Sequence, residues 1–255
     1  MLATLERLAL APDIEHVWNG LLAYMERFGF DRLIYGYTRF RTANSFGDPA
    51  DMLLLSNHDR AFLTPFMQDG LYFHGPMVRW ASENTGACSW RWIHDKAANG
   101  HLTPEEQAVV AFNRAHGITA GYTISFPNVS IRSKGALGLT ARRGLTQDDV
   151  DALWREHGRE ILIVANVAHL KMTGLPYAGT ARRLTTRQRE VLEWVGDGKT
   201  AQDIATIMGL TPTTVEKHLR LARDVLGVET TAQAVLKASF HNQIFNLQTG
   251  NGAGR

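Results

Sequence analysis

The sequence predicts two domains, an N-terminal α/β/α sandwich with an antiparallel sheet and a C-terminal all-α domain. Helical and strand patterns alternate over roughly the first 170 residues, whereas only helical patterns follow residue 183. Between the two blocks, the segment 172–183 carries two glycines and a proline with little apolar periodicity, which is typical of a linker. We therefore predict a first domain over 1–172, a linker over 173–182, a second domain over 183–245 and a flexible tail over 246–255.

The composition is that of an ordinary soluble globular protein, with 44% hydrophobic and 20% charged residues. We expect a cytoplasmic protein without a membrane partner, because there is neither an apolar run of about 18 residues nor a signal-peptide pattern. The net charge of +2 permits nucleic-acid binding without requiring it. The single cysteine, Cys88, excludes an internal disulfide, and we interpret it as a small buried apolar residue because no cysteine-enzyme motif surrounds it.

The N-terminal block begins and ends with predicted helices. Helical periodicity extends over 14–28 and 147–171, and Thr103-Pro104-Glu105-Glu106 predicts the start of a further helix that reaches about residue 116. Strands are predicted over 33–40, 52–56, 121–127 and 136–142. Short strands between terminal helices favour a sheet with helices on both faces. The inward face of the last helix is predicted to include Val150, Leu153, Trp154, Ile161, Ile163, Val164 and Val167.

The C-terminal block carries the spacing of a helix-turn-helix. Helices are predicted over 185–195 and 201–208, and a third begins after Thr211 with Pro212 in its first turn. Two helices that cross closely need a small residue at the crossing, a glycine in the turn and a branched apolar residue on the second helix. Ala205, Gly209 and Val215 occupy these places, so we predict that the third helix enters the major groove of DNA.

Polar side chains on the third helix are the candidate DNA contacts. Arginine donates a bidentate pair to guanine and glutamate accepts from cytosine, so Arg220 and Glu216 are candidates for reading bases. Lys199 and Thr200, before the second helix, suit a backbone phosphate. The alternative is a solvated polar helix face without function. The predicted DNA-binding residues are Lys199, Thr200, Thr213, Thr214, Glu216, Lys217, Arg220 and Arg223.

The segment 184–228 resembles the LuxR-type helix-turn-helix. The match includes Leu184-Thr185, Arg187, Glu190-Val191-Leu192, Gly198-Lys199, Ile204-Ala205, Thr214-Val215, His218-Leu219 and Leu226-Gly227-Val228. The resemblance implies a four-helix domain that binds a palindromic promoter site as a homodimer, with half-sites ~34 Å apart, and makes RNA polymerase a candidate partner. It also implies a fourth helix over 232–244 that helps dimerisation, for which Ala234, Val235, Ala238 and Ile244 are suitable.

The N-terminal block resembles the autoinducer-binding domain of quorum-sensing regulators. The segments GFDRLIYGY, GPMV, SWRW and HGITAGYTISFP carry the similarity, whereas the acidic pair, mid-domain Asp and late Lys of a phosphorylated receiver are absent. The resemblance implies that a small signal molecule, an acyl-homoserine lactone in this family, lies between the sheet and a helical layer. It places His58, Phe62, Phe66, Tyr72, Gly75, Trp90 and Gly121 at this ligand site.

Three polar anchors of the family's ligand are altered in this sequence. His58 stands where the family has a Tyr that binds the acyl carbonyl, Phe62 where a Trp binds the lactone carbonyl, and Gly75 where an Asp accepts from the amide. A buried amide without an acceptor costs about 1–3 kcal/mol, so the loss of two anchors predicts roughly two decades weaker lactone binding. Unless Asp69 or His74 replaces the Asp, the pocket takes another, less polar signal or is filled by its own side chains, in which case the aromatic residues are simply core.

These observations favour a LuxR-type transcriptional regulator that responds to a ligand or acts without one. The rival hypothesis is an interaction protein that heterodimerises with and inhibits a related regulator. An enzyme is not expected, since there is no G-x-S-x-G motif, phosphate-binding loop or metal-spaced histidine pair, and no cofactor is predicted beyond a signal molecule. His94, Asp95 and His101 are interpreted as surface residues.

Overall fold

The computed structural model describes residues 1–42, 46–128, 130–177 and 183–245, which form two compact units. One unit comprises Met1–Phe46 and Leu54–Thr173, and is called the sensor unit below. The other comprises Gly174–Arg255 together with the short segment Gly47–Leu53, and is called the C-terminal unit. No helix in the described part of the chain is both long and apolar enough to cross a membrane.

The sensor unit is built on an antiparallel five-stranded sheet of order β2-β1-β5-β4-β3. The strands are β1 (Phe30–Thr38), β2 (Leu53–Ser56), β3 (Gly86–Ser89), β4 (Gly121–Ser125) and β5 (Lys134–Ala141). Side chains alternate between the two faces of a strand, so neighbouring residues of β1 serve different layers. Tyr35 hydrogen-bonds His169 on one face, whereas Ile34 packs against an aromatic cluster on the other.

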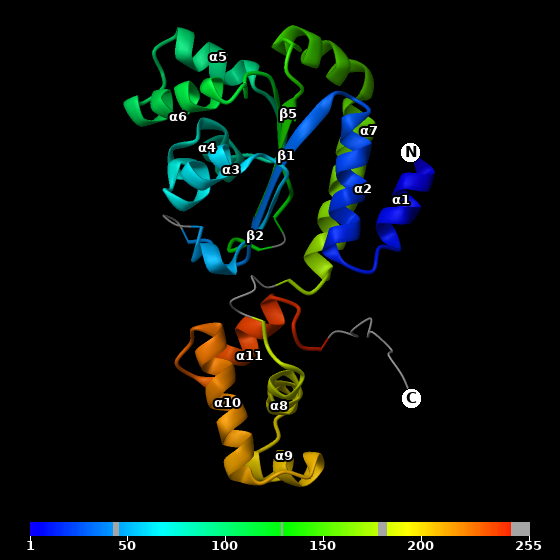
Figure 1. The fold of residues 1–255 in the computed structure, drawn as a ribbon, viewed down its shortest axis with the longest axis vertical. Helices are drawn as coiled ribbons and strands as arrows, with labels where there is room; N and C mark the ends of the chain where they lie inside the picture. The colour runs from blue at the N-terminus through cyan, green and yellow to red at the C-terminus, as the bar shows by residue number, and fades with distance from the viewer. Residues whose placement is uncertain (43–45, 129, 178–182, 246–255) are drawn as a thin grey trace. The chain divides into compact units, whose positions relative to one another are not determined.

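Helices cover both faces of this sheet, as the sequence predicts (Figure 1). One layer holds α1 (Leu2–Ala9), α2 (Ile14–Glu26) and α7 (Gln147–Gly174), and the other holds short helices that connect β2 to β4. These short helices are α3 (Arg60–Leu63), η2 (Thr64–Gln68), η3 (Leu71–His74), α4 (Pro76–Glu83), α5 (Arg91–Ala98) and α6 (Pro104–Ala115); a further short helix, η1 (Pro49–Asp51), precedes β2. The predicted capping box at Thr103 is present, with both reciprocal hydrogen bonds.

The long helix α7 packs its inner face against the sheet. Val150, Ile161 and Val164 are buried as predicted, and the ring of Trp154 stacks on Tyr122 of β4 at 3.9 Å. The prediction for Ile163 is wrong, because its side chain is 38% exposed. The helical turn places the neighbouring positions 161, 164, 165 and 168 inward, so position 163 points to solvent.

The C-terminal unit contains four α-helices in the described residues: α8 (Thr186–Gly196), α9 (Ala201–Met208), α10 (Pro212–Leu226) and α11 (Thr231–Phe240). They surround one core in which Val191, Ile204, Val215 and Leu219 are buried. Gly209 has φ of 65°, the left-handed conformation that a glycine adopts easily, and it ends α9 before the turn into α10. Part of the predicted linker and the predicted tail lie outside the described residues.

Candidate DNA-binding face and signal site

Helix α10 separates a buried side from a polar side. Val215, Leu219, Ala222 and Leu226 are buried in the core of the unit. Thr213, Glu216, Lys217 and Arg220 are exposed at the helical spacing that places them on the opposite side. The crossing with α9 is close, since Ala205 is only 2% exposed where the two helices pack. This is the arrangement in which an α-helix presents a polar edge to a groove of DNA.

The remaining predicted DNA-binding residues make contacts of their own within the unit. The Arg223 guanidinium donates to the Thr231 hydroxyl at 2.9 Å and thereby joins α10 to the start of α11. The Thr214 hydroxyl lies 2.9 Å from that of Thr211, in the N-terminal cap of α10. The hydroxyl and the backbone N–H of Thr200 donate to the Asp203 carboxylate, at 2.7 and 3.0 Å respectively. These hydrogen bonds lower the pKa of Asp203.

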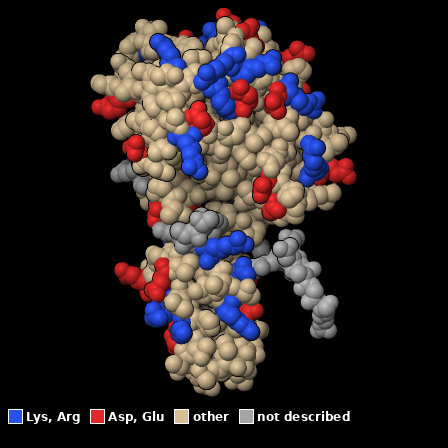
Figure 2. Space-filling view, viewed as in Figure 1, with Lys and Arg blue, Asp and Glu red and all other residues tan. Residues whose placement is uncertain are grey.

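Lys199 and Arg220 keep charges that are accessible to solvent. Lys199 is exposed beside the N-terminus of α9, and the side chain of Arg220 is 59% exposed although it pairs with Asp224 at 3.2 Å. An exposed pair of this kind is worth little, so it can be exchanged for a contact with DNA. Acidic and basic side chains are interspersed over the visible face of the protein (Figure 2), so local placement rather than net charge marks the candidate face.

Helix α11 differs from the sequence prediction in which residues it exposes. Of the residues for which the family resemblance implied a role in dimerisation, Ala234, Ala238 and Ile244 are buried in the core of their own unit, and Val235 packs against this core. The helix ends at Phe240, before residue 244. Leu236 is instead a large apolar side chain that α11 exposes, at 53%. Composition alone could not separate these positions, because the same apolar residues serve a core and an interface.

In the sensor unit, the predicted ligand residues lie together between the sheet and the helices of the β2–β4 connection. Phe62, Phe66, Tyr72 and Trp90 belong to one buried cluster. His58 lies at its edge, where its ring is 4.7 Å from that of Phe62. Gly75 and Gly121 are also buried. The sequence resemblance thus brought together residues that are up to 63 positions apart, from 58 to 121.

Aromatic rings fill much of this cluster. The ring of Phe62 stacks on Phe66 at 4.9 Å and on Phe112 at 5.6 Å. Burial, with a smaller repulsion from Arg32, lowers the pKa of His58 to about 4, so its ring is neutral at physiological pH. Its Nε2 lies 3.4 Å from the Thr140 hydroxyl. A neutral imidazole among phenyl rings makes this end of the site weakly polar.

Two polar atoms in this region have no hydrogen-bond partner among the described residues. They are the hydroxyl of Tyr72 and Oδ1 of Asn113, a residue of α6, the helix that packs against η3. Burial raises the pKa of Tyr72, so the hydroxyl remains protonated and able to donate. A buried polar group without a partner is costly, and a bound molecule can supply the partner. Sequence reasoning did not identify Asn113, which carries no motif.

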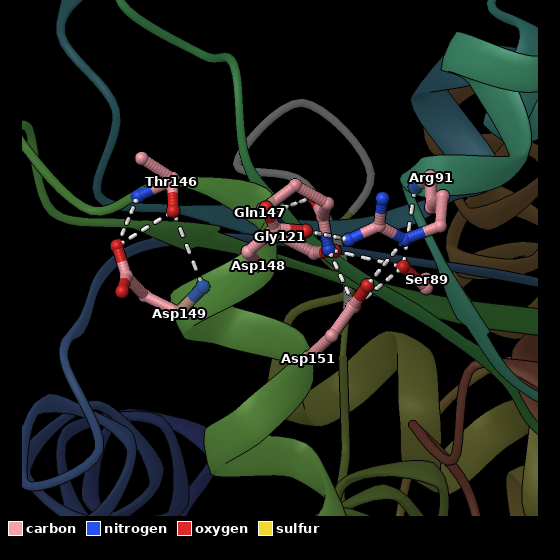
Figure 3. A network of polar contacts seen from close by, with 8 residues as sticks. All are labelled: Ser89, Arg91, Gly121, Thr146, Gln147, Asp148, Asp149 and Asp151. Atoms are coloured by element: carbon pink, nitrogen blue, oxygen red, sulfur yellow. Dashed lines mark hydrogen bonds and ion pairs between the residues drawn. The ribbon is translucent and has the colours of Figure 1, made fainter.

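Gly121 is held at the sheet by a polar network (Figure 3), and Trp90 is hydrogen-bonded beside it. The Trp90 indole N–H donates to the Thr123 hydroxyl at 2.9 Å, and its backbone N–H donates to the Gly121 carbonyl. The Gln147 side chain accepts from the Gly121 N–H at 3.0 Å and donates to Asp151 at 2.8 Å. A β-carbon at position 121 would lie 2.2 Å from the Leu139 carbonyl oxygen, so only glycine fits here.

The same network joins β3 and α5 to the N-terminus of α7. Ser89 donates to Asp151 at 2.7 Å, and Arg91 pairs with both Asp148 and Asp151. Burial raises the pKa of Asp151, but hydrogen bonds from Ser89, Gln147 and Arg91 outweigh it and leave this pKa lowered. The network therefore keeps a charged carboxylate beneath the candidate site. No sequence motif indicated it, because its members come from three separate segments of the chain.

Among the residues that the structure describes, Cys88 and the remaining His, Asp and Glu side chains do not gather into a metal site. Cys88 is half-buried, and burial raises the pKa of its thiol to about 11, which keeps it protonated and unreactive at neutral pH. No group of three or more His, Cys, Asp or Glu side chains within the described ranges is placed to hold a metal ion. His94, Asp95 and His101 are exposed, as the sequence predicts.

Comparison with known protein families finds a matching family for each part of the chain. The model described as autoinducer binding domain matches residues 13–172, and the one described as bacterial regulatory proteins, luxR family, matches residues 182–238. The transcriptional activator protein BjaR1 of Bradyrhizobium diazoefficiens is 27% identical, and the alignment covers 94% of each chain. The transcriptional activator protein LuxR of Aliivibrio fischeri is 24% identical, and the alignment covers 74% of each chain.

Solved structures of similar proteins include Escherichia coli SdiA and CepR2 from Burkholderia cenocepacia. SdiA is 19% identical with a TM-score of 0.49, and the match covers 96% of this chain and 97% of SdiA. CepR2 is described as an N-acylhomoserine lactone dependent LuxR family transcription factor; it is 20% identical with a TM-score of 0.49, covering 67% of this chain and 94% of CepR2.

Proposed function

Because the chain belongs to the LuxR-type quorum-sensing transcriptional regulators, a family of regulators rather than enzymes, we propose that it binds double-stranded promoter DNA as a homodimer through α10. The observation that carries this proposal is the polar side of α10, where Thr213, Glu216 and Arg220 are exposed while the opposite side is buried. Two copies of such a helix read a palindromic site. Leu236, exposed on α11, is the apolar contact that we assign to the dimer.

The residues of this face divide into base contacts and phosphate contacts. Arg220 and Glu216 lie one helical turn apart, so they reach neighbouring bases from one side of α10. Lys217 and Lys199 supply charge to the phosphates on either side. Thr200, Thr214 and Arg223 act through the caps and the α10–α11 contact described above, which hold the helix ends in place. RNA polymerase remains a candidate partner of the DNA-bound dimer.

Binding to DNA tests this assignment directly. A duplex site is first selected from a random-sequence library with the full-length protein, and affinities are then measured at several salt concentrations. Arg220→Ala is expected to weaken binding to the selected site by about 10- to 100-fold and to relax discrimination at one base pair. Lys217→Ala is expected to weaken selected and random duplexes alike and to lower the salt slope by about one.

Arg159→Ala is the matched control, because it removes an exposed arginine from α7 of the sensor unit. Its affinity is expected to equal that of the parent protein. Unchanged affinity of the Arg220 and Lys217 variants for both kinds of duplex would refute the assignment of α10. A protein that forms no homodimer in sedimentation experiments, yet associates with a related regulator, would support the inhibitory alternative.

For the sensor unit, we propose that a small molecule with one carbonyl and one N–H or O–H group binds at the aromatic cluster. The Tyr72 hydroxyl can donate to the carbonyl, and Oδ1 of Asn113 can accept from the donor, so these atoms take over from the anchors lost at positions 62 and 75. The stacked rings of Phe62, Phe66 and Phe112 favour a compact ligand over one with a long chain. Cytoplasmic signal molecules of low polarity fit this description.

Removal of the Tyr72 hydroxyl tests whether the aromatic cluster is a ligand site or an ordinary core. Tyr72→Phe is expected to stabilise the ligand-free protein by about 1–2 kcal/mol, because a buried hydroxyl without a partner is deleted. The same variant is expected to lose the stabilisation that a panel of acyl-homoserine lactones and smaller amides gives the parent protein in thermal unfolding. Loss of stability in Tyr72→Phe without ligand would mean that the hydroxyl already has a partner, and would contradict this role. Native mass spectrometry of the purified protein identifies any ligand carried from the cell.

A further inference from the structure

A buried lysine without an acidic partner begins strand β5 of the sensor unit. Lys134 is only 6% exposed, and its ammonium group donates to the Asn84 carbonyl at 2.9 Å. This is its one hydrogen bond among the described residues, and no carboxylate of these residues forms an ion pair with it. An ammonium group has three donors, and a lysine is almost never fully buried unless its charge is paired. Lys134 can therefore bind an anion in addition to the carbonyl.

A second cation lies at the same end of the sheet. The backbone N–H of Arg41 donates to the Arg132 carbonyl at 2.9 Å, just beyond the paired residues Thr38 of β1 and Lys134 of β5. The half-buried Arg41 side chain has no hydrogen bond or ion pair among the described residues. Burial, and to a smaller extent the charge of Arg41, lowers the pKa of Lys134. An anion that contacts both side chains would relieve their repulsion.

Lys134 faces the helical layer that contains the aromatic cluster. The next residue, Gly135, faces α7 instead, since a β-carbon there would lie 2.6 Å from the ring of His169. Successive residues of a strand point to opposite faces of the sheet. Lys134 therefore points into the other layer, where its partner Asn84 follows the end of α4. The candidate signal site and the buried lysine thus share one face of the sheet.

This face of the sheet is open between the lysine and the aromatic cluster. Thr38 is the Cα partner of Lys134, and Ile34, four residues earlier on the same face of β1, packs against the cluster. Gly36 lies between them, and a β-carbon there would have no atom within 4 Å. Four residues of a strand span about 13 Å. A small molecule over Gly36 can therefore contact the cluster at one end and the long Lys134 side chain at the other.

The polarity of this face changes along the strands. At the lysine end, the Phe46 carbonyl accepts from the Thr38 hydroxyl at 2.9 Å, and the Phe46 ring lies 6.5 Å from that of Tyr72. At the other end, six residues further along β5, Thr140 lies beside the neutral ring of His58. A molecule that fits both ends is apolar at one end and charged at the other, with the Tyr72 hydroxyl available to it.

On the basis of the ligand site proposed above, we propose that the signal molecule is a small carboxylic acid that also carries an amide, and that Lys134 and Arg41 bind its carboxylate. The amide carbonyl accepts from the Tyr72 hydroxyl, the amide N–H donates to Oδ1 of Asn113, and the apolar group lies on the aromatic rings. N-acylated amino acids have this chemistry. The buried ion pair forms only with the acid, so Lys134 selects the acid over neutral molecules of the same shape.

Calorimetric titration of the full-length protein tests this selection with matched pairs of compounds. N-benzoylglycine, N-phenylacetylglycine and N-butanoylglycine are each compared with their primary amides, which have nearly the same shape but no charge. The parent protein is expected to bind the acids at least about tenfold more tightly than the amides. Lys134→Met is expected to bind the acids about 10- to 100-fold more weakly than the parent protein and to bind the amides equally well, which removes the preference.

A second variant keeps the test valid if Lys134→Met does not fold. Arg41→Gln is expected to weaken binding of the acids about threefold and to leave binding of the amides unchanged. Arg159→Gln, which removes an exposed cation from α7, is the matched control and is expected to bind both as the parent protein does. Acids that bind Lys134→Met as tightly as the parent protein would show that the lysine only caps α4, and would overturn the proposal.

The remaining outcomes separate this proposal from the ligand site on which it rests. If the parent protein binds acids and amides equally and Tyr72→Phe loses both, the ligand site is kept and the carboxylate is refuted. Failure of every acid to bind, while a neutral amide or lactone binds, has the same meaning. If none of these compounds binds, both the acid and the ligand site are refuted, whereas the assignment of α10 to DNA is unaffected.

Discussion

The two candidate sites of this protein are assembled in different ways. In the C-terminal unit, all four helices begin after a threonine whose side chain accepts a backbone N–H three residues on: Thr185, Thr200, Thr211 and Thr230. In the sensor unit, the contacts that hold Trp90, Gly121 and His58 join residues that are 26 to 82 positions apart. A DNA-binding face can therefore be specified by local signals, whereas the signal site depends on the register of a sheet.

Some substitutions should lower the stability of one unit and not of the other. The largest such effect is expected at Gly121. Gly121→Ala forces a β-carbon against the Leu139 carbonyl oxygen at 2.2 Å and the Trp90 ring at 2.9 Å. Overpacking of this kind costs about 3 kcal/mol or more, which is a large fraction of a domain's stability, and we expect the sensor unit to lose this stability while the C-terminal unit keeps its own. Urea unfolding, followed by tryptophan fluorescence and by circular dichroism, measures the stability of the two units.

Gly36→Ala provides the matched control for this substitution. Gly36 lies in β1 of the same sheet, and a β-carbon there would have no atom within 4 Å. Its unfolding curve is expected to follow that of the parent protein within about 0.5 kcal/mol. Equal destabilisation by the two variants would show that the sheet tolerates crowding at β4, and would weaken the contrast between the units.

The difference between the units explains which features the sequence could predict. Thr200, Gly209 and Thr211 mark helix ends by their own chemistry, so α9 and α10 were predicted to within a residue. The short elements η2, η3 and α5 were not predicted, because one or two turns leave little periodicity. Ile163 was assigned to the core of α7 on composition, although its position on the helix points outward.

Long-range contacts could not be predicted from the sequence, because no local pattern marks them. Nothing near Gln147 indicates that its amide reaches Gly121. The ligand residues were identified by resemblance to a family, whose motifs carry the register of the sheet implicitly. Asn113 has no such motif, and only its unpartnered buried oxygen draws attention to it.

A second and smaller loss of stability is expected at low pH, mainly in the sensor unit. Burial lowers the pKa of both His58 and His169 to about 4, so the folded protein keeps these rings neutral while the unfolded chain binds protons from about pH 6.5 downwards. Stability is therefore lost as pH falls from about 6.5 to about 4, by about 2–3 kcal/mol for each residue. Unfolding midpoints between pH 7.5 and pH 4.5 measure the loss.

His169→Gln isolates one of these two residues. Its ring stacks on Phe126 at 4.0 Å and its Nδ1 lies 2.9 Å from the Tyr35 hydroxyl, so the variant is less stable at neutral pH but loses less stability in acid. His16→Gln, at an exposed position of α2, is expected to keep the parent slope. An unchanged slope in His169→Gln would show that this residue is protonated without cost, against the burial argument.

The smallest effect is expected from the loss of a helix cap in the C-terminal unit. Thr185→Ala removes the capping box of α8 and is expected to destabilise this unit by about 1 kcal/mol. Thr206→Ala, in the middle of α9, removes a hydroxyl that bonds only to the Gln202 carbonyl and is expected to be neutral. Thermal unfolding by circular dichroism compares the two. An equal loss in both variants would mean that caps do not define these helices.

The sheet of the sensor unit also bears on how the protein behaves at high concentration. Its outer strands β2 and β3 have only four residues each, whereas the inner strands β1, β5 and β4 have nine, eight and five. The unpaired backbone groups of an edge strand are a template for another chain, and short edges offer few of them. The sheet that organises the signal site thus gives little opportunity for strand addition, which protects a cell that accumulates the regulator from edge-to-edge aggregation.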